Sequence, residues 1–172
     1  FIGGLNPLTF YRKMKDVALF AFSTSSSAAT IPVTLRTVNQ DLGVNQNVAS
    51  FVVPVGATIN MDGTAIMQGL ATVFIAQMSG IDLTLFQYIQ VVLLAVATSI
   101  GTAAVPSAGT ITLIIILQQF NLPLEAIGII LAVDRVLDMI RTSVNVTGDA
   151  AIACIVAKTE NQLDENIFNS KA

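Results

Sequence analysis

The sequence predicts an all-α membrane protein in which two re-entrant helical hairpins are each followed by a transmembrane helix, as an inverted repeat. The first reason is composition, because the 172 residues are 53% hydrophobic and 11% charged, whereas soluble domains carry about 25% charged residues. The second reason is spacing. Apolar runs too short to cross a bilayer are broken by small polar residues and proline, and such interrupted segments in corresponding halves are typical of transporters.

The first hairpin is expected over residues 17–42. Its first apolar run, Val17–Phe22, is too short to span a membrane, and the serine-rich stretch Ser23–Pro32 then interrupts it. Residues 1–16 are interpreted as the end of a preceding helix and a cytoplasmic loop. The segment Arg12–Lys15 contains three basic residues, and basic loops favour the cytoplasmic side.

The next element, residues 47–79, is expected to cross the membrane as a helix interrupted at Asn60–Gly63. Asn60 and Asp62 are costly in a bilayer, and Gly63 permits an unwound backbone. Irregular backbone at membrane depth is tolerated where it lines a cavity, and its free carbonyl groups can coordinate a cation. A polar contact between two helices is the alternative interpretation.

A second hairpin is expected over residues 84–120 and a final helix over residues 126–158. They complete a transport domain at 17–160, which a loose polar tail at 161–172 follows. The turns on either side of the second hairpin contain acidic but no basic residues, so the positive-inside rule places them outside the cell. The two hairpins therefore enter the membrane from opposite sides, and the protein is multi-pass.

The final helix carries polar side chains inside an apolar segment. At about 100° per residue, they fall within an arc of about 100° on one helix face. These positions are Asp134, Asp138, Arg141, Thr142, Asn145 and Asp149. A polar stripe at membrane depth is costly and usually faces a partner, a cavity or a solute, so this face is the expected wall of a binding site. Buried Asp138–Arg141 and Asp134–Arg135 ion pairs that only join helices are the alternative.

Two features of the composition restrict the reactions that the chain could catalyse. The chain has no His and a single cysteine, Cys154, which removes the commonest general base and any internal disulfide. The protein is therefore not expected to be an enzyme. An intramembrane hydrolase with Ser25–Ser27 as nucleophile is the enzymatic alternative, but no basic side chain lies near that stretch. No organic cofactor and no nucleic acid partner are expected.

Four motifs follow one another along the chain: Ser25–Ser27 with Pro32, Asn60–Thr64, Ser99–Gly109, and Asp138–Asp149. Together they resemble the carboxyl-terminal half of the glutamate/aspartate transporter family, the dicarboxylate/amino acid:cation symporters. The resemblance implies symport of an acidic amino acid by an elevator-type transport domain, which moves against a scaffold within a homotrimer in the lipid bilayer. The scaffold helices are expected in a missing amino-terminal part, so the chain is interpreted as a partial carrier. The expected location is the plasma membrane, specifically the bacterial inner membrane.

By this resemblance, Arg141 would bind the side-chain carboxylate of the substrate and Asp138 its ammonium group. A guanidinium offers a planar fork that fits a carboxylate. The other residues implied for the amino-acid site are Ser26, Ser27, Thr64, Val105, Gly109, Thr142 and Asn145. Ser25 and Met139 stand where many members carry a further arginine, and Arg135 is the nearest extra cation.

The resemblance also implies Na⁺ as the coupling ion, with H⁺ as the alternative. Backbone carbonyls of interrupted helices coordinate Na⁺ in transporters. One Na⁺ site would use Gly56, Asn60, Asn145 and Asp149, a second Thr58, Ser99, Ile100 and Thr102, and a third Asn60 and Asp62. Ala104 and Ser107 stand where small residues, often glycine, are usual, which predicts a stiffer second hairpin tip.

Other functions remain open at this point. A C4-dicarboxylate carrier of the same fold has no ammonium group to offer Asp138, and its second carboxylate would be repelled there. A neutral amino-acid exchanger should lack Arg141. A channel would need a ring of carbonyls or charges around one pore. A fragment without transport activity of its own is the remaining alternative.

Overall fold

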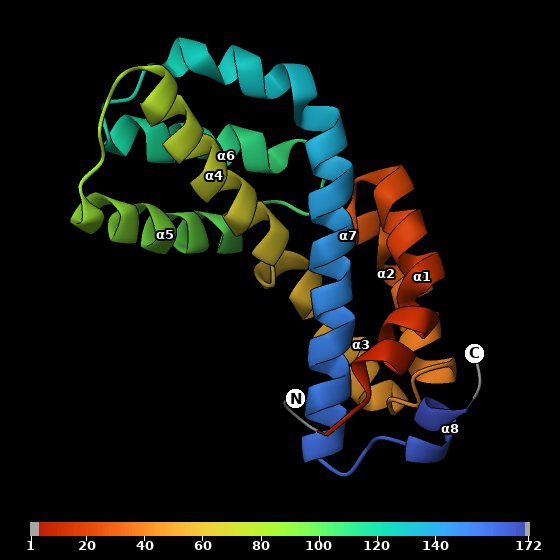
Figure 1. Cartoon of the computed structure of the whole chain (residues 1–172). Coiled ribbons are helices and arrows are strands. Elements are labelled where there is room, and N and C mark those ends of the chain that lie inside the picture. The colour runs from red at the N-terminus through yellow and green to blue at the C-terminus, as the bar shows by residue number, and fades with distance from the viewer. Residues whose placement is uncertain (1–3, 171–172) are drawn as a thin grey trace.

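The computed structural model describes residues 4–170, and within these residues the chain is entirely helical apart from turns and connections (Figure 1). The helices are α1 (Pro7–Thr24), α2 (Ser27–Gln40), α3 (Gln46–Ile59), α4 (Asp62–Met78), α5 (Leu85–Ile100), α6 (Ala108–Gln119), the 3₁₀ turn η1 (Leu124–Ala126), α7 (Ile127–Thr159) and α8 (Glu165–Asn169). The only extended pairing in this part of the chain is one antiparallel bridge between Val44 and Leu163. The all-α prediction is confirmed.

The helices lie in two groups along α7 (Figure 1), and each group has its own hydrophobic core. Helices α1, α2 and α3 pack around the carboxyl-terminal part of α7, where Met14 and Val53 meet Val146. Helices α4, α5 and α6 enclose the other core, which includes Leu113 and reaches Ile130 near the start of α7. The polar middle of α7 therefore lies between the two cores.

The first helical hairpin, α1–α2, begins earlier than the sequence analysis placed it. Helix α1 starts at Pro7 because Asn6 caps it, accepting hydrogen bonds from the backbone N–H of Leu8 and Thr9 at 2.9 and 3.4 Å. The basic segment Arg12–Lys15 is thus helical rather than a loop. Of the predicted segment 1–16, residues 1–3 lie outside the described residues.

The helix is interrupted near Asn60, as predicted, but the break is shorter than the predicted Asn60–Gly63 and its glycine has another role. Helix α3 ends at Ile59 and α4 begins at Asp62, so the break covers only two residues. Gly63 is already helical. A Cβ there would lie 2.6 Å from the backbone oxygen of Arg141, which means that glycine permits the close approach of α4 to α7.

Replacing Gly63 with alanine should therefore lower the melting temperature of the complete carrier. The two helix backbones would have to separate, and overpacking of this kind costs about 1–3 kcal/mol. Gly69→Ala on the same helix is the matched control, because a Cβ there meets no atom within 4 Å and alanine favours helix formation. Equal melting temperatures for the two variants would contradict the close-approach role.

The segment after α7 is not the loose tail that its polar composition predicted. Through Ser170 it turns back along the molecule, pairs at Leu163 with Val44, and buries Phe168 completely. One apolar residue is enough to anchor a polar segment when the core has a place for it. Residues 171–172 of the predicted tail lie outside the described residues.

Large apolar side chains are exposed along most helices. They include Phe51, Leu70, Leu85, Leu93, Ile111 and Val136. In the part of the chain that the structure describes, no helix combines the length and the apolar character required to cross a membrane.

Candidate functional site

Both hairpin tips and the break between α3 and α4 meet the polar face of α7 at one small cavity. Its volume is about 10 Å³, roughly the space of one water molecule. The lining residues are Ser25, Ser27, Met61, Thr64, Thr102, Ala103, Ala104, Val105, Gly109, Asp138, Arg141, Thr142 and Asn145. Of the residues predicted for the amino-acid site, only Ser26 is missing from this lining.

Arg141 is the most unusual group in this cavity. Its side chain is only 4% exposed, and its Nε donates a hydrogen bond to Asp138 Oδ1 at 2.8 Å. Nη2 lies 3.7 Å from Asp134 Oδ1, which is too long for a hydrogen bond. Within residues 4–170, neither Nη1 nor Nη2 has a hydrogen-bond partner. Buried donors are rarely left unpaired because the loss of hydration is costly. The Nη1 and Nη2 groups of Arg141 are therefore available to bind an acceptor in the cavity.

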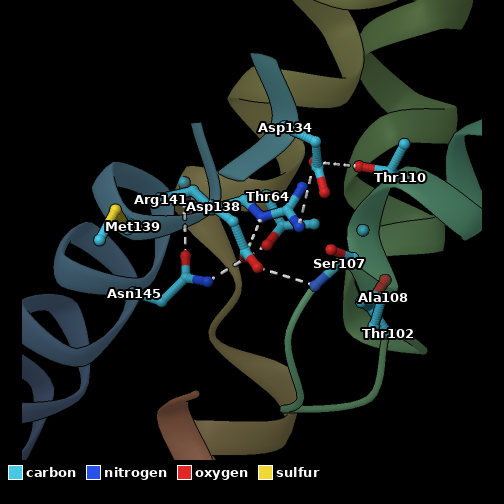
Figure 2. Close-up of polar contacts among 12 residues, drawn as sticks. Thr64, Thr102, Ser107, Ala108, Thr110, Asp134, Asp138, Met139, Arg141 and Asn145 are labelled. Atoms are coloured by element: carbon cyan, nitrogen blue, oxygen red, sulfur yellow. Dashed lines mark hydrogen bonds and ion pairs between the residues drawn. The ribbon is translucent and has the colours of Figure 1, made fainter. Parts of the chain in front are cut away.

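The second hairpin contacts the two carboxylates on either side of Arg141 (Figure 2). The backbone N–H of Ser107 donates to Asp138 Oδ2 at 2.7 Å, and the Thr110 hydroxyl donates to Asp134. Ser107 has a φ of 62°, a left-handed conformation that disfavours residues other than glycine. The tip of the second hairpin is therefore held in a costly backbone conformation, in which the Ser107 N–H donates to the Asp138 carboxylate.

A buried amide on α4 joins both arms of the second hairpin. Gln68 donates from Nε2 to the backbone oxygen of Gly109 at 3.0 Å and to Thr112 Oγ1 at 2.6 Å. Its Oε1 accepts from the Thr98 hydroxyl at 2.9 Å. This network ties the inner ends of α5 and α6 to α4, and no motif or periodicity in the sequence indicated it.

The first hairpin tip turns its serines in directions that the sequence did not reveal. Ser25 is left-handed, with a φ of 51°, and its buried Oγ has no partner among the described residues. Ser26 instead donates from Oγ to the backbone oxygen of Ala104 at 2.9 Å, so it joins the two tips. Ser25 therefore takes the cavity position that the sequence analysis gave to Ser26.

Asn145 connects α7 to the break between α3 and α4. Its Oδ1 accepts from the backbone N–H of Gly63 at 2.7 Å. Its Nδ2 lies 3.2 Å from both Thr64 Oγ1 and Met61 Sδ. A change in the backbone at the break therefore reaches a side chain that lines the cavity. Met61 was also missed, since an apolar residue inside a polar motif gives no sequence signal for a site.

The residues of the first predicted cation site lie close together. Asp149 is buried and accepts a hydrogen bond from Asn60 Nδ2 at 3.0 Å. A Cβ on Gly56 would lie 2.6 Å from Asp149 Oδ1, so the backbone of α3 passes directly beside this carboxylate. Asn145 lies one turn earlier on α7. A carboxylate beside the end of an interrupted helix offers the oxygen donors that suit a Na⁺ ion.

The other two predicted cation sites are less complete. Ser99 and Thr102 share one turn, with the Thr102 N–H donating to the Ser99 oxygen at 3.0 Å, but Thr102 also lines the cavity. Thr58 and Ile100 are exposed, as is Asp62. Within the described residues, no three carboxylate or thiol side chains converge as a metal site.

Comparison with known sequences identifies the family. The model of the sodium:dicarboxylate symporter family matches residues 1–159. The chain belongs to this family. It is 48% identical over 151 residues to an excitatory amino acid transporter of Caenorhabditis elegans and to human excitatory amino acid transporter 2, covering 88% of the chain in each case. It is 48% identical over 167 residues to mouse excitatory amino acid transporter 3, covering 96% of the chain.

Membership of the sodium:dicarboxylate symporter family confirms the resemblance found in the sequence. This is a family of transporters, so the prediction that the protein is not an enzyme is also confirmed. The chain spans between 26% and 32% of the length of these three relatives.

Proposed function

We propose that this chain is the carboxyl-terminal transport-domain part, at residues 17–160, of a Na⁺-coupled symporter for aspartate or glutamate. The observation that carries the proposal is the buried Arg141 guanidinium. Its two terminal nitrogens have no hydrogen-bond partner among the described residues, while Nε donates to Asp138. A guanidinium whose terminal N–H groups can still donate, beside a carboxylate, suits a molecule with a carboxylate on its side chain and an ammonium group. An acidic amino acid carries both.

The site described here is closed, and binding therefore requires movement. A cavity of about 10 Å³ holds no amino acid. The tip amide of Ser107 occupies Asp138 Oδ2, the acceptor proposed for the substrate ammonium group. Substrate entry would withdraw Ser107 from Asp138, and the tip would close again over the bound molecule. The rest of the binding surface would come from other residues that line the cavity: Ser25, Ser27, Thr64, Val105, Gly109, Thr142 and Asn145.

Sodium would bind beside this site. Gly56, Asn60 and Asp149 lie together, and Asn145 bonds to the backbone that follows Asn60. Filling the cation site would fix the break between α3 and α4, and the bond from Gly63 to Asn145 would carry that order to the cavity wall. Two further cation sites are proposed, one with Thr58, Ser99, Ile100 and Thr102 and the other with Asn60 and Asp62.

The proposed setting is a plasma membrane, with the hairpins re-entrant and the transport domain moving as an elevator. Apolar side chains exposed on α4 and α5 support a lipid or protein environment around the domain. The remaining scaffold helices would come from a part of the carrier outside this sequence, and three copies would assemble. The relatives are about three times as long as the region they share with this chain.

The role of Asp138 can be tested with two ligands. Asp138→Asn in the complete carrier should weaken aspartate binding much more than succinate binding, because only aspartate presents a cation to that carboxylate. Competition of both ligands against labelled aspartate, with calorimetry on the purified variant, measures the ratio. Equal weakening of the two would assign Asp138 a structural role and favour a C4-dicarboxylate carrier.

A further inference from the structure

Asp134 is a buried carboxylate that lies between two donors, and only one of them is bonded to it. The Thr110 hydroxyl, in the first turn of α6, donates a hydrogen bond to Asp134 Oδ1 (Figure 2). The other donor is Arg141, whose Nη2 lies 3.7 Å from the same oxygen atom, beyond hydrogen-bond distance. Within residues 4–170, Thr110 is the one hydrogen-bond donor to this carboxylate. Asp134 is therefore bonded to the second hairpin and not to the arginine.

The three side chains are shielded from water. Thr110 is 2% exposed, and Asp134 and Arg141 are each 4% exposed. A buried carboxylate that loses its hydrogen-bond donor keeps the full cost of desolvation. The Nη2 group of Arg141 has no hydrogen-bond partner, and a shift of about 1 Å would bring it within hydrogen-bond distance of Asp134. If Thr110 moves away, Asp134 is therefore expected to bind Arg141.

Thr110 belongs to the part of the second hairpin that has to move for a ligand to reach Arg141. It follows Gly109, where a Cβ would lie 2.8 Å from Arg141 Nη1, so the backbone of α6 lies directly against the guanidinium. A ligand carboxylate can reach this nitrogen only when the first turn of α6 withdraws. The same movement breaks the bond from Thr110 to Asp134.

We propose that Thr110 is a positioning residue that makes the Arg141 guanidinium fully available to substrate only when the second hairpin is closed. With the hairpin closed, Thr110 bonds Asp134, and both terminal nitrogens of Arg141 can donate to the side-chain carboxylate of the substrate. With the hairpin open, Asp134 binds Nη2 and competes with the substrate. Closure therefore strengthens the binding of an acidic side chain, and opening favours its release. This inference rests on the proposed function, because it assigns an acidic substrate to Arg141.

Competition binding to the complete carrier in lipid nanodiscs tests this role, with aspartate and asparagine as the two ligands. They have nearly the same size, but only aspartate has a side-chain carboxylate. Thr110→Val removes the hydroxyl and keeps the shape of the side chain. It should weaken aspartate binding relative to asparagine binding by about tenfold or more, as expected for one hydrogen bond to a charged group. Thr110→Ser keeps the hydroxyl and should retain the wild-type ratio.

A second variant tests whether the effect of Thr110 passes through Asp134. In the Asp134→Asn background, Thr110→Val should no longer change the ratio of the two affinities, because a neutral amide competes weakly for a guanidinium. Thr159→Val, at an exposed position of α7, is the matched control and should leave both affinities unchanged. Equal weakening of aspartate and asparagine by Thr110→Val, or no weakening of either, would overturn the proposal.

A substrate-free structure of Thr110→Val separates this inference from the proposed function. Electron cryomicroscopy of the variant should show Asp134 Oδ1 and Arg141 Nη2 about 3 Å apart, whether the second hairpin is open or closed, compared with 3.7 Å in the wild-type chain. A separation that stays near the wild-type value would contradict the positioning role. If the separation shortens but the wild-type carrier binds aspartate no better than asparagine, the proposed substrate is wrong and the competition for Asp134 stands.

Discussion

Replacing Arg141 with cysteine in the complete carrier should weaken aspartate binding by about 30-fold to about 4,000-fold. Removing one partner of a buried charge pair costs about 2–5 kcal/mol, and Arg141 is the only cation among the residues that line the cavity. Without the guanidinium, the substrate side-chain carboxylate would be buried beside Asp138 and Asp134 with no compensation. Small neutral amino acids would lose nothing and should compete better than in the wild type.

The matched control for this variant is Arg135→Cys. Arg135 lies on the same helix but is exposed, so its loss should leave aspartate affinity nearly unchanged. Uptake of labelled aspartate in competition with unlabelled aspartate, serine and alanine measures both effects. If Arg141→Cys kept the wild-type aspartate affinity, Arg141 would be a structural residue and the proposed substrate class would be wrong.

The apparent affinity for aspartate should rise steeply with Na⁺ concentration, and Asp149→Asn should flatten that rise. Coupling between two ligands is typically about 1–3 kcal/mol, a factor of about 5 to 150, and is reciprocal. Asp149 does not line the cavity, so its effect would have to pass through Asn60, the helix break and Asn145. In Asp149→Asn, the aspartate affinity at saturating Na⁺ should therefore stay near the wild-type value, whereas the increase of that affinity with Na⁺ concentration should be smaller.

Titration of aspartate binding against Na⁺ at two pH values tests this coupling. Gly56→Ala should act in the same direction, because its Cβ would lie 2.6 Å from Asp149 Oδ1, and Asp82→Asn in an exposed turn should have no effect. Aspartate binding that depends on pH and ignores Na⁺ would replace Na⁺ with H⁺ as the coupling ion. The acidic amino-acid site would survive that outcome.

The sequence by itself determined the class of fold and the identity of the polar face. Low charge with interrupted apolar runs indicated helices broken at functional points, and α3 and α4 do separate at Asn60–Met61. The stripe from Asp134 to Asp149 followed from helical periodicity alone. These features are local. Helix breaks depend on neighbouring residues, and the helix face on which a side chain lies follows from its spacing along the helix.

Tertiary structure alone decided which groups meet. Ser25 and Ser26 are neighbouring residues of the same type, yet Ser25 lines the cavity and Ser26 joins the two hairpin tips. The left-handed backbone at Ser25 sets the directions of the two side chains. The glycine at 63 has a packing role that only its distance to Arg141 reveals. The Lys13 ammonium group donates a hydrogen bond to the backbone oxygen of Ile167, which is 154 positions away in the sequence. Contacts between distant segments leave no local periodicity or spacing in the chain, so they cannot be predicted from the pattern of a single sequence.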